Sequence, residues 1–280
     1  MQNRSKVLKI IDNHNFRVKK FYGQNFLTDS FIITKIAEIA CLDKNTTVLE
    51  IGPGTGALTE ELLKRSKKVI AYEIDNEVIP ILKENTDNYS NLEIINEDIL
   101  KADLSRLKDE DNLVTVANLP YYITSPIIDL FLNKMPNIKR AIYMVQKEVA
   151  DRLSASEGTK DYNSFSILVQ YYATCKKQLF VSRKSFVPEP NVDSVVIELE
   201  KYDRTFKPKN ETLFKRVVES SFKERRKTLI NNLSNSFKIP KDTLKDVLCN
   251  LGIKEDARGE TLTIDDYIHL TDIMEEMLWV

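Results

Sequence analysis

The sequence predicts an α/β fold: a seven-stranded, mainly parallel sheet with helices on both faces, followed by a small all-α domain. Three observations predict it. From about residue 46, short apolar runs rich in β-branched residues alternate with longer runs of helical period, which is the pattern of βαβ units. A glycine cluster, Gly52 to Gly56, directly follows the first short run. After about residue 205 the short runs stop and only helical periodicity continues.

The elements of the first part follow in order along the chain. Seven short apolar runs are expected to form strands: residues 48–51, 68–74, 92–96, 112–117, 141–145, 179–181 and 192–199. Three segments between them are expected to be helical: residues 57–65, 76–84 and 126–133. We expect Ser125 to cap the last of these helices and Pro126 to occupy its first position, where a backbone N–H would have no partner.

The second part begins after a polar stretch, residues 201–210. Apolar side chains then recur at helical spacing, and Gly252 is expected to end one of the helices. The last helix should begin at Thr263, because Thr263 and Asp266 have the spacing of a capping box. We therefore expect three segments: an N-terminal arm over residues 1–18, a cofactor-binding domain over 19–204 and a helical domain over 205–280.

Composition excludes several classes of protein. The 280 residues contain no run of about 18 apolar side chains, and the basic start lacks the apolar stretch of a signal peptide. We therefore expect a cytoplasmic protein without membrane contact. The cysteines, Cys41, Cys175 and Cys249, form no closely spaced pair and leave an odd one over, so neither a metal site nor a disulfide is expected.

The net charge of −1 conceals an uneven distribution of charge. Residues 1–20 carry six bases against one acid, residues 201–230 ten against four, and residues 241–280 four against ten. Two basic patches on a nearly neutral chain fit a protein that binds phosphates, although a solvated helix face and a basic arm would give the same pattern. The basic run in the second patch is made of Lys223, Arg225, Arg226 and Lys227.

The glycine cluster predicts a nucleotide site. Because it follows a strand and opens a helix, the backbone can approach a ligand where side chains would block it. By itself the cluster would suit NAD, FAD or S-adenosylmethionine. The spacing of Gly52, Gly54 and Gly56, and the lack of any group suited to hydride transfer, favour S-adenosylmethionine, whose activated methyl group needs alignment more than a metal.

Two acidic residues at strand ends indicate that the predicted site binds a nucleoside. Glu73, beside Ile74, comes at the end of the second expected strand, where its carboxylate can accept both ribose hydroxyls. Asp98, beside Ile99, follows the third strand and can accept a hydrogen bond from an adenine amino group. The carboxyl ends of parallel strands meet at one edge of the sheet, so both acids are expected in the same site.

The residues at the end of the fourth strand indicate which chemical group accepts the methyl. If the side-chain oxygen of Asn118 and the carbonyl of Leu119 accept the two hydrogens of a base amino group, the nitrogen lone pair is directed at the methyl. Tyr121 offers a ring on which that base can stack. Phe186 could cover the opposite face of the base, or could equally anchor its loop in the core. A base in this pocket must be unstacked from its neighbours.

These motifs together resemble those of the ribosomal RNA adenine dimethyltransferases, in particular the branch that modifies two adjacent adenosines near the 3′ end of 16S rRNA in the small subunit. The resemblance runs from about Lys19 to the last helix. It rests on seven separated segments: residues 20–27, 50–56, 118–122, 146–152, 188–194, 225–229 and 258–262.

The resemblance implies further roles. Gln24, Asn25 and Leu27 would close over S-adenosylmethionine, and Asn118 would complete the cofactor site as well as serve catalysis. Two methyl groups would be transferred to each adenine, the helical domain would bind RNA, and the enzyme would act as a monomer without a metal. Two alternatives remain: a dimethyltransferase of 23S rRNA that confers macrolide resistance, and a non-catalytic nucleic-acid-binding assembly factor.

Overall fold

The computed structural model describes residue 19 and residues 23–278; the expected arm, residues 1–18, lies outside the described residues. The chain divides into two compact units. Of the described residues, the first unit contains those up to residue 150 and residues 174–201, and the second contains residues 151–173 and those from residue 202 onward.

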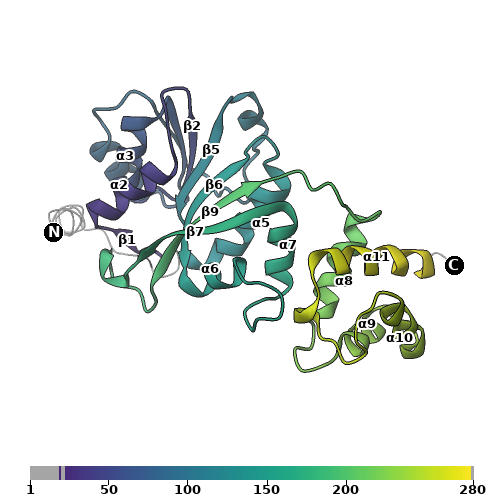
Figure 1. The fold of residues 1–280 in the computed structure, drawn as a ribbon. Coiled ribbons are helices and arrows are strands. Elements are labelled where there is room, and N and C mark those ends of the chain that lie inside the picture. The colour runs from purple at the N-terminus through teal and green to yellow at the C-terminus, as the bar shows by residue number, and fades with distance from the viewer. Residues whose placement is uncertain (1–18, 20–22, 279–280) are drawn as a thin grey trace. The chain divides into compact units, whose positions relative to one another are not determined.

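A seven-stranded sheet forms the centre of the first unit (Figure 1). Its strands are β2 (Thr47–Ile51), β3 (Lys68–Tyr72), β4 (Leu92–Ile95), β5 (Leu113–Asn118), β6 (Arg140–Gln146), β7 (Ala173–Val181) and β9 (Ser194–Lys201). They lie in the order β4-β3-β2-β5-β6-β9-β7. The first five are mutually parallel, and β9 pairs antiparallel with β6. The predicted fold class is therefore confirmed.

Most strand boundaries differ from the prediction by one or two residues, and two of the differences affect the interpretation. The second strand ends at Tyr72 rather than at residue 74, so Glu73 and Ile74 belong to the loop that follows it. Strand β7 begins at Ala173, well before the expected residue 179, and its first half includes the polar residues Lys176, Lys177 and Gln178. That half lacks an apolar signal because β7 is the last strand of the sheet, where side chains remain exposed.

Helices alternate with most of the strands along the chain, although between β4 and β5 a 3₁₀ turn takes their place. They are α2 (Ser30–Ile39), α3 (Ala57–Arg65), α4 (Ile79–Asn85), α5 (Thr124–Lys134) and α6 (Lys147–Leu153), with short 3₁₀ turns η2 (Ser105–Asp109) and η3 (Tyr121–Ile123). Helix α4 begins three residues later than expected, since the side chain of Asp75 accepts from the Glu77 backbone and holds a turn there. Helix α5 begins at Thr124 rather than at residue 126, because η3 runs directly into it, so Ser125 lies inside the helix and is not its N-cap.

The strand order reverses between β2 and β5, and this reversal positions the site. Right-handed crossovers place α3, which follows β2, and α5, which follows β5, on opposite faces of the sheet. On one face, Leu62 of α3 packs with Val48 and Val116. On the other, the rings of Phe131 in α5 and Tyr143 in β6 meet edge to face at 6.2 Å. A crevice therefore opens where the carboxyl ends of β2 and β5 diverge.

A second, two-stranded sheet joins distant parts of the first unit. Strand β1 (Phe26–Leu27) pairs antiparallel with β8 (Phe186–Val187), with Leu27 opposite Phe186. A 3₁₀ turn, η4 (Arg183–Ser185), leads from β7 to β8. In Figure 1 the loop that follows β7 lies beside β1. The segment before α2 is thus held by a stretch of chain about 160 residues later.

The second unit is a cluster of helices. It contains α7 (Ser164–Tyr172), α8 (Glu211–Ser221), α9 (Leu229–Phe237), α10 (Lys241–Asn250) and α11 (Ile264–Leu278), with the 3₁₀ turn η5 (Gly259–Thr261). As predicted, Thr263 and Asp266 form a reciprocal capping box at the start of α11. Gly252 ends α10 with a φ of +69°, which is the left-handed conformation expected of a capping glycine.

The division between the units differs from the expected boundary at residue 205. Residues 151–173, assigned from the sequence to the cofactor-binding domain, group with the C-terminal helices. The physical reason is that Ile167 and Tyr171 of α7 are buried in the same apolar cluster as Phe214 and Val217 of α8. The sequence did not reveal this because α7 lies between two strands of the other unit along the chain.

Candidate active site

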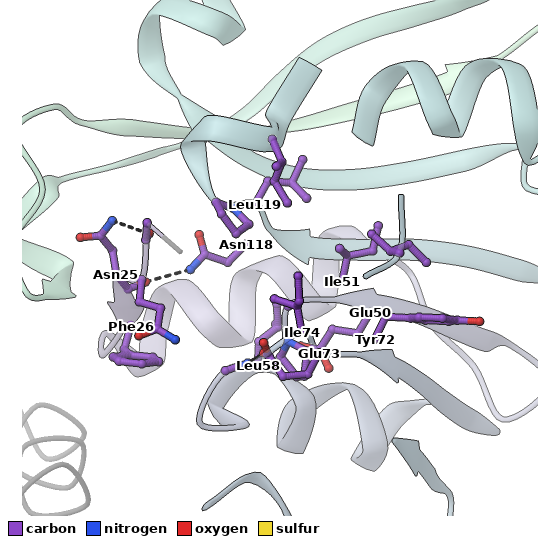
Figure 2. Close-up of a pocket in the computed structure, with 18 of the residues that line it drawn as sticks. Asn25, Phe26, Glu50, Ile51, Leu58, Tyr72, Glu73, Ile74, Asn118 and Leu119 are labelled. Carbon is purple, nitrogen blue, oxygen red and sulfur yellow. Dashed lines mark hydrogen bonds between the residues drawn. The ribbon is translucent and has the colours of Figure 1, made fainter. Parts of the chain in front are cut away.

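A cavity of about 340 Å³ opens at the carboxyl edge of the sheet, in the crevice between β2 and β5. Six short stretches line it: residues 23–27, 50–55, 57–58, 72–74, 97–101 and 118–123. Figure 2 shows Asn118 and Leu119 on one side and Glu50, Tyr72, Glu73 and Ile74 on another. The volume lies within the range of small-molecule sites.

The glycine loop needs glycine at each of its three predicted positions. Gly52, Gly54 and Gly56 have φ values of +67°, +56° and +89°. A Cβ on Gly54 would approach the ring of Phe26 to 3.2 Å, so the loop and β1 lie close together across the cavity. Gly56 was predicted to bind the cofactor, but it does not line the cavity; it begins α3, and a Cβ there would meet Leu82 of α4 at 2.8 Å.

Glu73 is nearly buried beside the loop. Its carboxylate accepts hydrogen bonds from the backbone N–H of Gly54 at 3.1 Å and of Asp75 at 2.9 Å. Burial raises the pKa of this carboxyl group. A carboxylate has about four acceptor positions, so the two backbone bonds leave capacity for the hydroxyls of a ribose. The predicted role is therefore compatible with a second function, which is to hold the glycine loop against the end of β3.

Asp98 and Ile99 also line the cavity, as Ile74 does. One carboxylate oxygen of Asp98 accepts from the backbone N–H of Leu100 at 3.0 Å, which fixes the orientation of the side chain. Ile99 is 4% exposed, and Ile74 is 41% exposed. An acceptor next to two branched apolar side chains is suited to a flat heterocycle that carries an amino group.

Asn118 at the end of β5 faces Asn25 (Figure 2). Its side-chain nitrogen donates to the backbone oxygen of Asn25 at 3.1 Å. Because the nitrogen is engaged, the side-chain oxygen is directed away from Asn25 and can accept a hydrogen bond. Leu119, the neighbour of Asn118, is 1% exposed, and its backbone N–H donates to Met144 at 3.1 Å. The strand pairing therefore holds this stretch rigidly.

Tyr121 is anchored at its far end. Its hydroxyl forms a hydrogen bond of 3.0 Å with Ser194, a buried residue at the start of β9. Burial raises the pKa of the Tyr121 phenol, so the group stays neutral at physiological pH. With the hydroxyl fixed, the ring stands at the cavity wall, as required for stacking.

Phe186 is placed differently from the prediction that it flanks a base. Its side chain is 1% exposed and belongs to the apolar core of the first unit, and it does not line the cavity. The alternative expectation, a loop anchor in the core, describes this arrangement. Phe186 acts on the site through its strand, because β8 holds β1 and with it Phe26 and Leu27.

The segment before β1 is held by a buried acid that the sequence analysis missed. Asp75, 2% exposed, accepts from the side chain of Gln24 and from the ammonium group of Lys19, each at 2.7 Å. The backbone N–H of Lys19 in turn donates to Gln24 at 2.8 Å. Asp75 follows Glu73, the acid predicted to bind the ribose, by two residues. This second acid close to Glu73 was the sequence feature that could have identified it.

Glu50 is a second residue that the sequence analysis missed. It lines the cavity from within β2 and is 1% exposed, and its Oε2 atom has no hydrogen-bond partner among the described residues. Burial raises the pKa of Glu50 to about 8, and the charge of Glu73 acts in the same direction. The sequence feature that could have identified Glu50 was a single acid in an otherwise apolar strand, directly before the glycine loop.

The predicted RNA-binding run lies in the second unit, between α8 and α9. All four of its residues, Lys223, Arg225, Arg226 and Lys227, are exposed. Arg225 donates to the backbone oxygen of Lys160 at 2.9 Å, and Lys227 pairs with Glu224 at 3.4 Å. Such exposed contacts are weak and leave the charge available to a polyanion.

Neither a membrane span nor a metal site is found in the described part of the chain. No helix there is long and apolar enough to span a bilayer. Nor do His, Cys, Asp and Glu side chains gather there in a group of three or more suited to a metal ion.

The fold and the cavity together define a class I methyltransferase that uses S-adenosylmethionine. The glycine loop leaves room for backbone contact, and three acids, Glu50, Glu73 and Asp98, line the cavity, so these residues fit the cofactor. The sequence model of the ribosomal RNA adenine dimethylase family matches residues 15–276. The chain belongs to this family.

Individual relatives agree with the family match. The chain is 44% identical over 279 residues to a ribosomal RNA small subunit methyltransferase A from a Geobacillus species, covering 96% of each chain. A dimethyladenosine transferase from Plasmodium falciparum is 31% identical, with a TM-score of 0.76 over 91% of this chain and 98% of the other. The 23S rRNA methyltransferase ErmE is 27% identical, with a TM-score of 0.70 over 90% and 100%.

Proposed function

We propose that the protein transfers methyl groups from S-adenosylmethionine to the exocyclic amino groups of two adjacent adenosines near the 3′ end of 16S rRNA, two methyl groups to each. The observation that carries the proposal is the bond from the Asn118 side-chain nitrogen to Asn25, because it leaves the amide oxygen as an acceptor at the cavity. An amino group next to a purine ring is the acceptor that such a site suits best.

The cofactor supplies a sulfonium methyl group that is already activated for transfer. The protein's own residues bind, align and exclude water. The Asn118 side-chain oxygen and the Leu119 carbonyl accept the two amino hydrogens, which draws the nitrogen toward tetrahedral geometry and directs its lone pair at the methyl group. Tyr121 supports the face of the ring. Glu73 and Asp98 hold the nucleoside end of the cofactor.

The segment that contains Gln24, Asn25 and Leu27 closes this site in our proposal. Its three tethers are the Asp75 carboxylate, the Asn118 amide and the pairing of β1 with β8. A base bound between this segment and Tyr121 has left its stack, so the substrate strand must be single-stranded or have the base flipped out.

Sequence identity to named relatives supports the small ribosomal subunit as the substrate. Identity to a relative named a small subunit methyltransferase is 44%, against 27% for the enzyme named for 23S rRNA. Because the substrate is ribosomal RNA, we propose a cytoplasmic enzyme, and we propose that it acts as a monomer. Light scattering during size-exclusion chromatography would test the oligomeric state, with a single mass near 32.4 kDa expected.

The test is to incubate the protein with methyl-labelled cofactor and with small or large ribosomal subunits that lack the modification. Label is expected in two adjacent adenosines of the small subunit, located by nuclease mapping and mass spectrometry. The Asn118→Ala variant serves as the control for contaminating activity. Label confined to the large subunit would select the 23S alternative, and RNA binding without label from any subunit would select the assembly factor.

A further inference from the structure

The outermost strand β7 and the η4 turn that follows it carry a basic surface that the proposed chemistry does not use. Between residues 173 and 188 the chain has four bases and no acid. We call this set, together with one exposed aromatic ring, the β7 edge. Its members are Lys176, Lys177, Phe180, Arg183 and Lys184, and all are exposed.

Phe180 distinguishes this surface from a protected edge strand. Lysines on an edge strand are a common device against aggregation, and Lys176 and Lys177 alone would be explained in this way. That device does not account for a large apolar ring at the same edge, and Phe180 is 56% exposed on β7, the last strand of the sheet. A ring among positive charges is instead the composition of a surface that stacks bases and binds phosphates.

Backbone bonds tie the β7 edge to the cavity from two sides. The backbone oxygen of Ser185 in η4 accepts from the N–H of Thr28 at 2.8 Å and from its hydroxyl at 3.0 Å. Thr28 directly follows β1, whose residues line the cavity. On the other side, the N–H of Arg183 donates to Asp193 at 2.9 Å, and the adjacent Ser194 holds the hydroxyl of Tyr121.

The ion pair that Arg183 of the β7 edge forms is weak enough for a phosphate to compete with it. Arg183 pairs with Glu189 at 3.1 Å, but the two side chains are 50% and 42% exposed, so water screens the pair and a phosphate can replace the carboxylate. Because η4 is bonded to Thr28, next to the lining residue Leu27, and to Asp193, next to the Tyr121 partner Ser194, a strand bound along the β7 edge is directed toward the site where the base is held.

We propose that the β7 edge binds the single-stranded RNA that flanks the target adenosines. The four basic side chains contact phosphates, and Phe180 stacks on a flanking base. The inference rests on the proposed function, because it takes ribosomal RNA as the substrate. It adds a surface in the first unit to the predicted basic run of the second unit.

The charge test compares two fourfold lysine or arginine to glutamine variants. The first removes the charges of the β7 edge through Lys176→Gln, Lys177→Gln, Arg183→Gln and Lys184→Gln. The matched control removes four exposed charges elsewhere in the same unit through Lys67→Gln, Lys83→Gln, Lys108→Gln and Lys139→Gln. Affinity for unmodified small subunits is measured between low and moderate salt, and cofactor affinity is measured by calorimetry.

The β7 edge variant should bind small subunits at least tenfold more weakly than the control variant. Its plot of log affinity against log salt should also be shallower, by about 0.7 for each phosphate that the variant no longer neutralises. Cofactor affinity should be unchanged, which shows that the cavity is intact. Equal affinity and equal salt slope in the two variants would overturn the inference.

A second pair of variants tests the stacking contact without a change of charge. Phe180→Ala should weaken binding roughly fivefold or more at an unchanged salt slope, whereas Phe31→Ala, which removes another ring that is 61% exposed, should not. If wild-type protein labels the small subunit while both β7 edge variants bind normally, only this inference fails. If wild-type protein labels no small-subunit adenosine, the proposed function fails and the inference falls with it.

Discussion

At the scale of single residues, Asn118 shows how one side chain can serve two purposes. Its nitrogen holds the segment before β1 through Asn25, and its oxygen is left for the substrate. Sequence reasoning identified Asn118 as a site residue because a polar side chain ends an otherwise apolar strand. It could not identify the partner, since Asn25 lies 93 residues earlier in the chain.

We expect Asn118→Ala to lower kcat by roughly 10²- to 10³-fold at saturating cofactor, because the variant has no positioned acceptor for the reacting amino group. Affinity for small subunits should stay within about twofold of wild type. Single-turnover methylation and filter binding measure the two quantities, with exposed Asn88→Ala as the control. A kcat near the wild-type value would remove Asn118 from the reaction.

Glu50 has a strongly raised pKa. Burial raises its pKa to about 8, so between about pH 4.5 and pH 8 the folded protein keeps a proton that the unfolded chain releases. The folded state is therefore penalised progressively as pH rises through this window. A neutral side chain of the same shape avoids the penalty.

We expect Glu50→Gln to raise the free energy of unfolding of the cofactor-free protein relative to wild type, by roughly 1–4 kcal/mol at pH 8.5. The gain should be close to zero at pH 4.5. Urea denaturation at the two pH values measures it, with Glu84→Gln on the exposed surface of α4 as the control. A gain that is independent of pH would contradict the assignment of a buried, protonated Glu50.

At the scale of elements, close packing decides where glycine is required. Gly56 was predicted as a cofactor contact because it belongs to the glycine cluster, but the structure uses it to bring α3 close to α4. A Cβ at this position would lie 2.8 Å from a methyl group of Leu82, which is fully buried, so that side chain would have to shift within the core. Sequence spacing cannot distinguish a glycine that faces a ligand from one that faces a helix.

We expect Gly56→Ala to lower the free energy of unfolding by roughly 2–4 kcal/mol, since a strained backbone and a steric overlap add together. Gly158→Ala is the matched control: its φ is +78°, but a Cβ there has open space around it. That variant should lose only about 1–2 kcal/mol. Equal losses in denaturant titrations would show that backbone strain alone explains Gly56.

Element boundaries were predictable where local chemistry sets them. The start of α11 is fixed by the exchange of hydrogen bonds between Thr263 and Asp266, three residues apart, so the sequence pattern was sufficient. The start of α5 depends on η3 running into it, and the start of β7 depends on its place at the sheet edge. Neither is encoded within a few neighbouring residues.

At the scale of the whole molecule, charge is distributed between the two units. The second unit holds the exposed run Lys223, Arg225, Arg226 and Lys227, whereas its last helices are acidic. A net charge near zero therefore coexists with surfaces that attract RNA. The run is well separated along the chain from every residue that lines the cavity.

We expect replacement of these four residues by glutamine to weaken small-subunit binding and to flatten its salt dependence, by about 0.7 in slope for each phosphate that is no longer neutralised. Cofactor affinity should not change. The control replaces four other lysines of the second unit, Lys238, Lys241, Lys245 and Lys254, with glutamine. If the two variants had the same affinity and slope, the run would have no part in RNA binding.

The sequence by itself determined the fold class, the glycine loop, the acids at the strand ends and the Asn118 to Tyr121 stretch. These features are encoded by periodicity and by residues close together in the chain. Only the tertiary structure decided which unit residues 151–173 join, that Phe186 is buried, that Asp75 holds the segment before β1, and that Glu50 lines the cavity. Each of these depends on which distant segments become neighbours, and that is settled by packing rather than by local pattern.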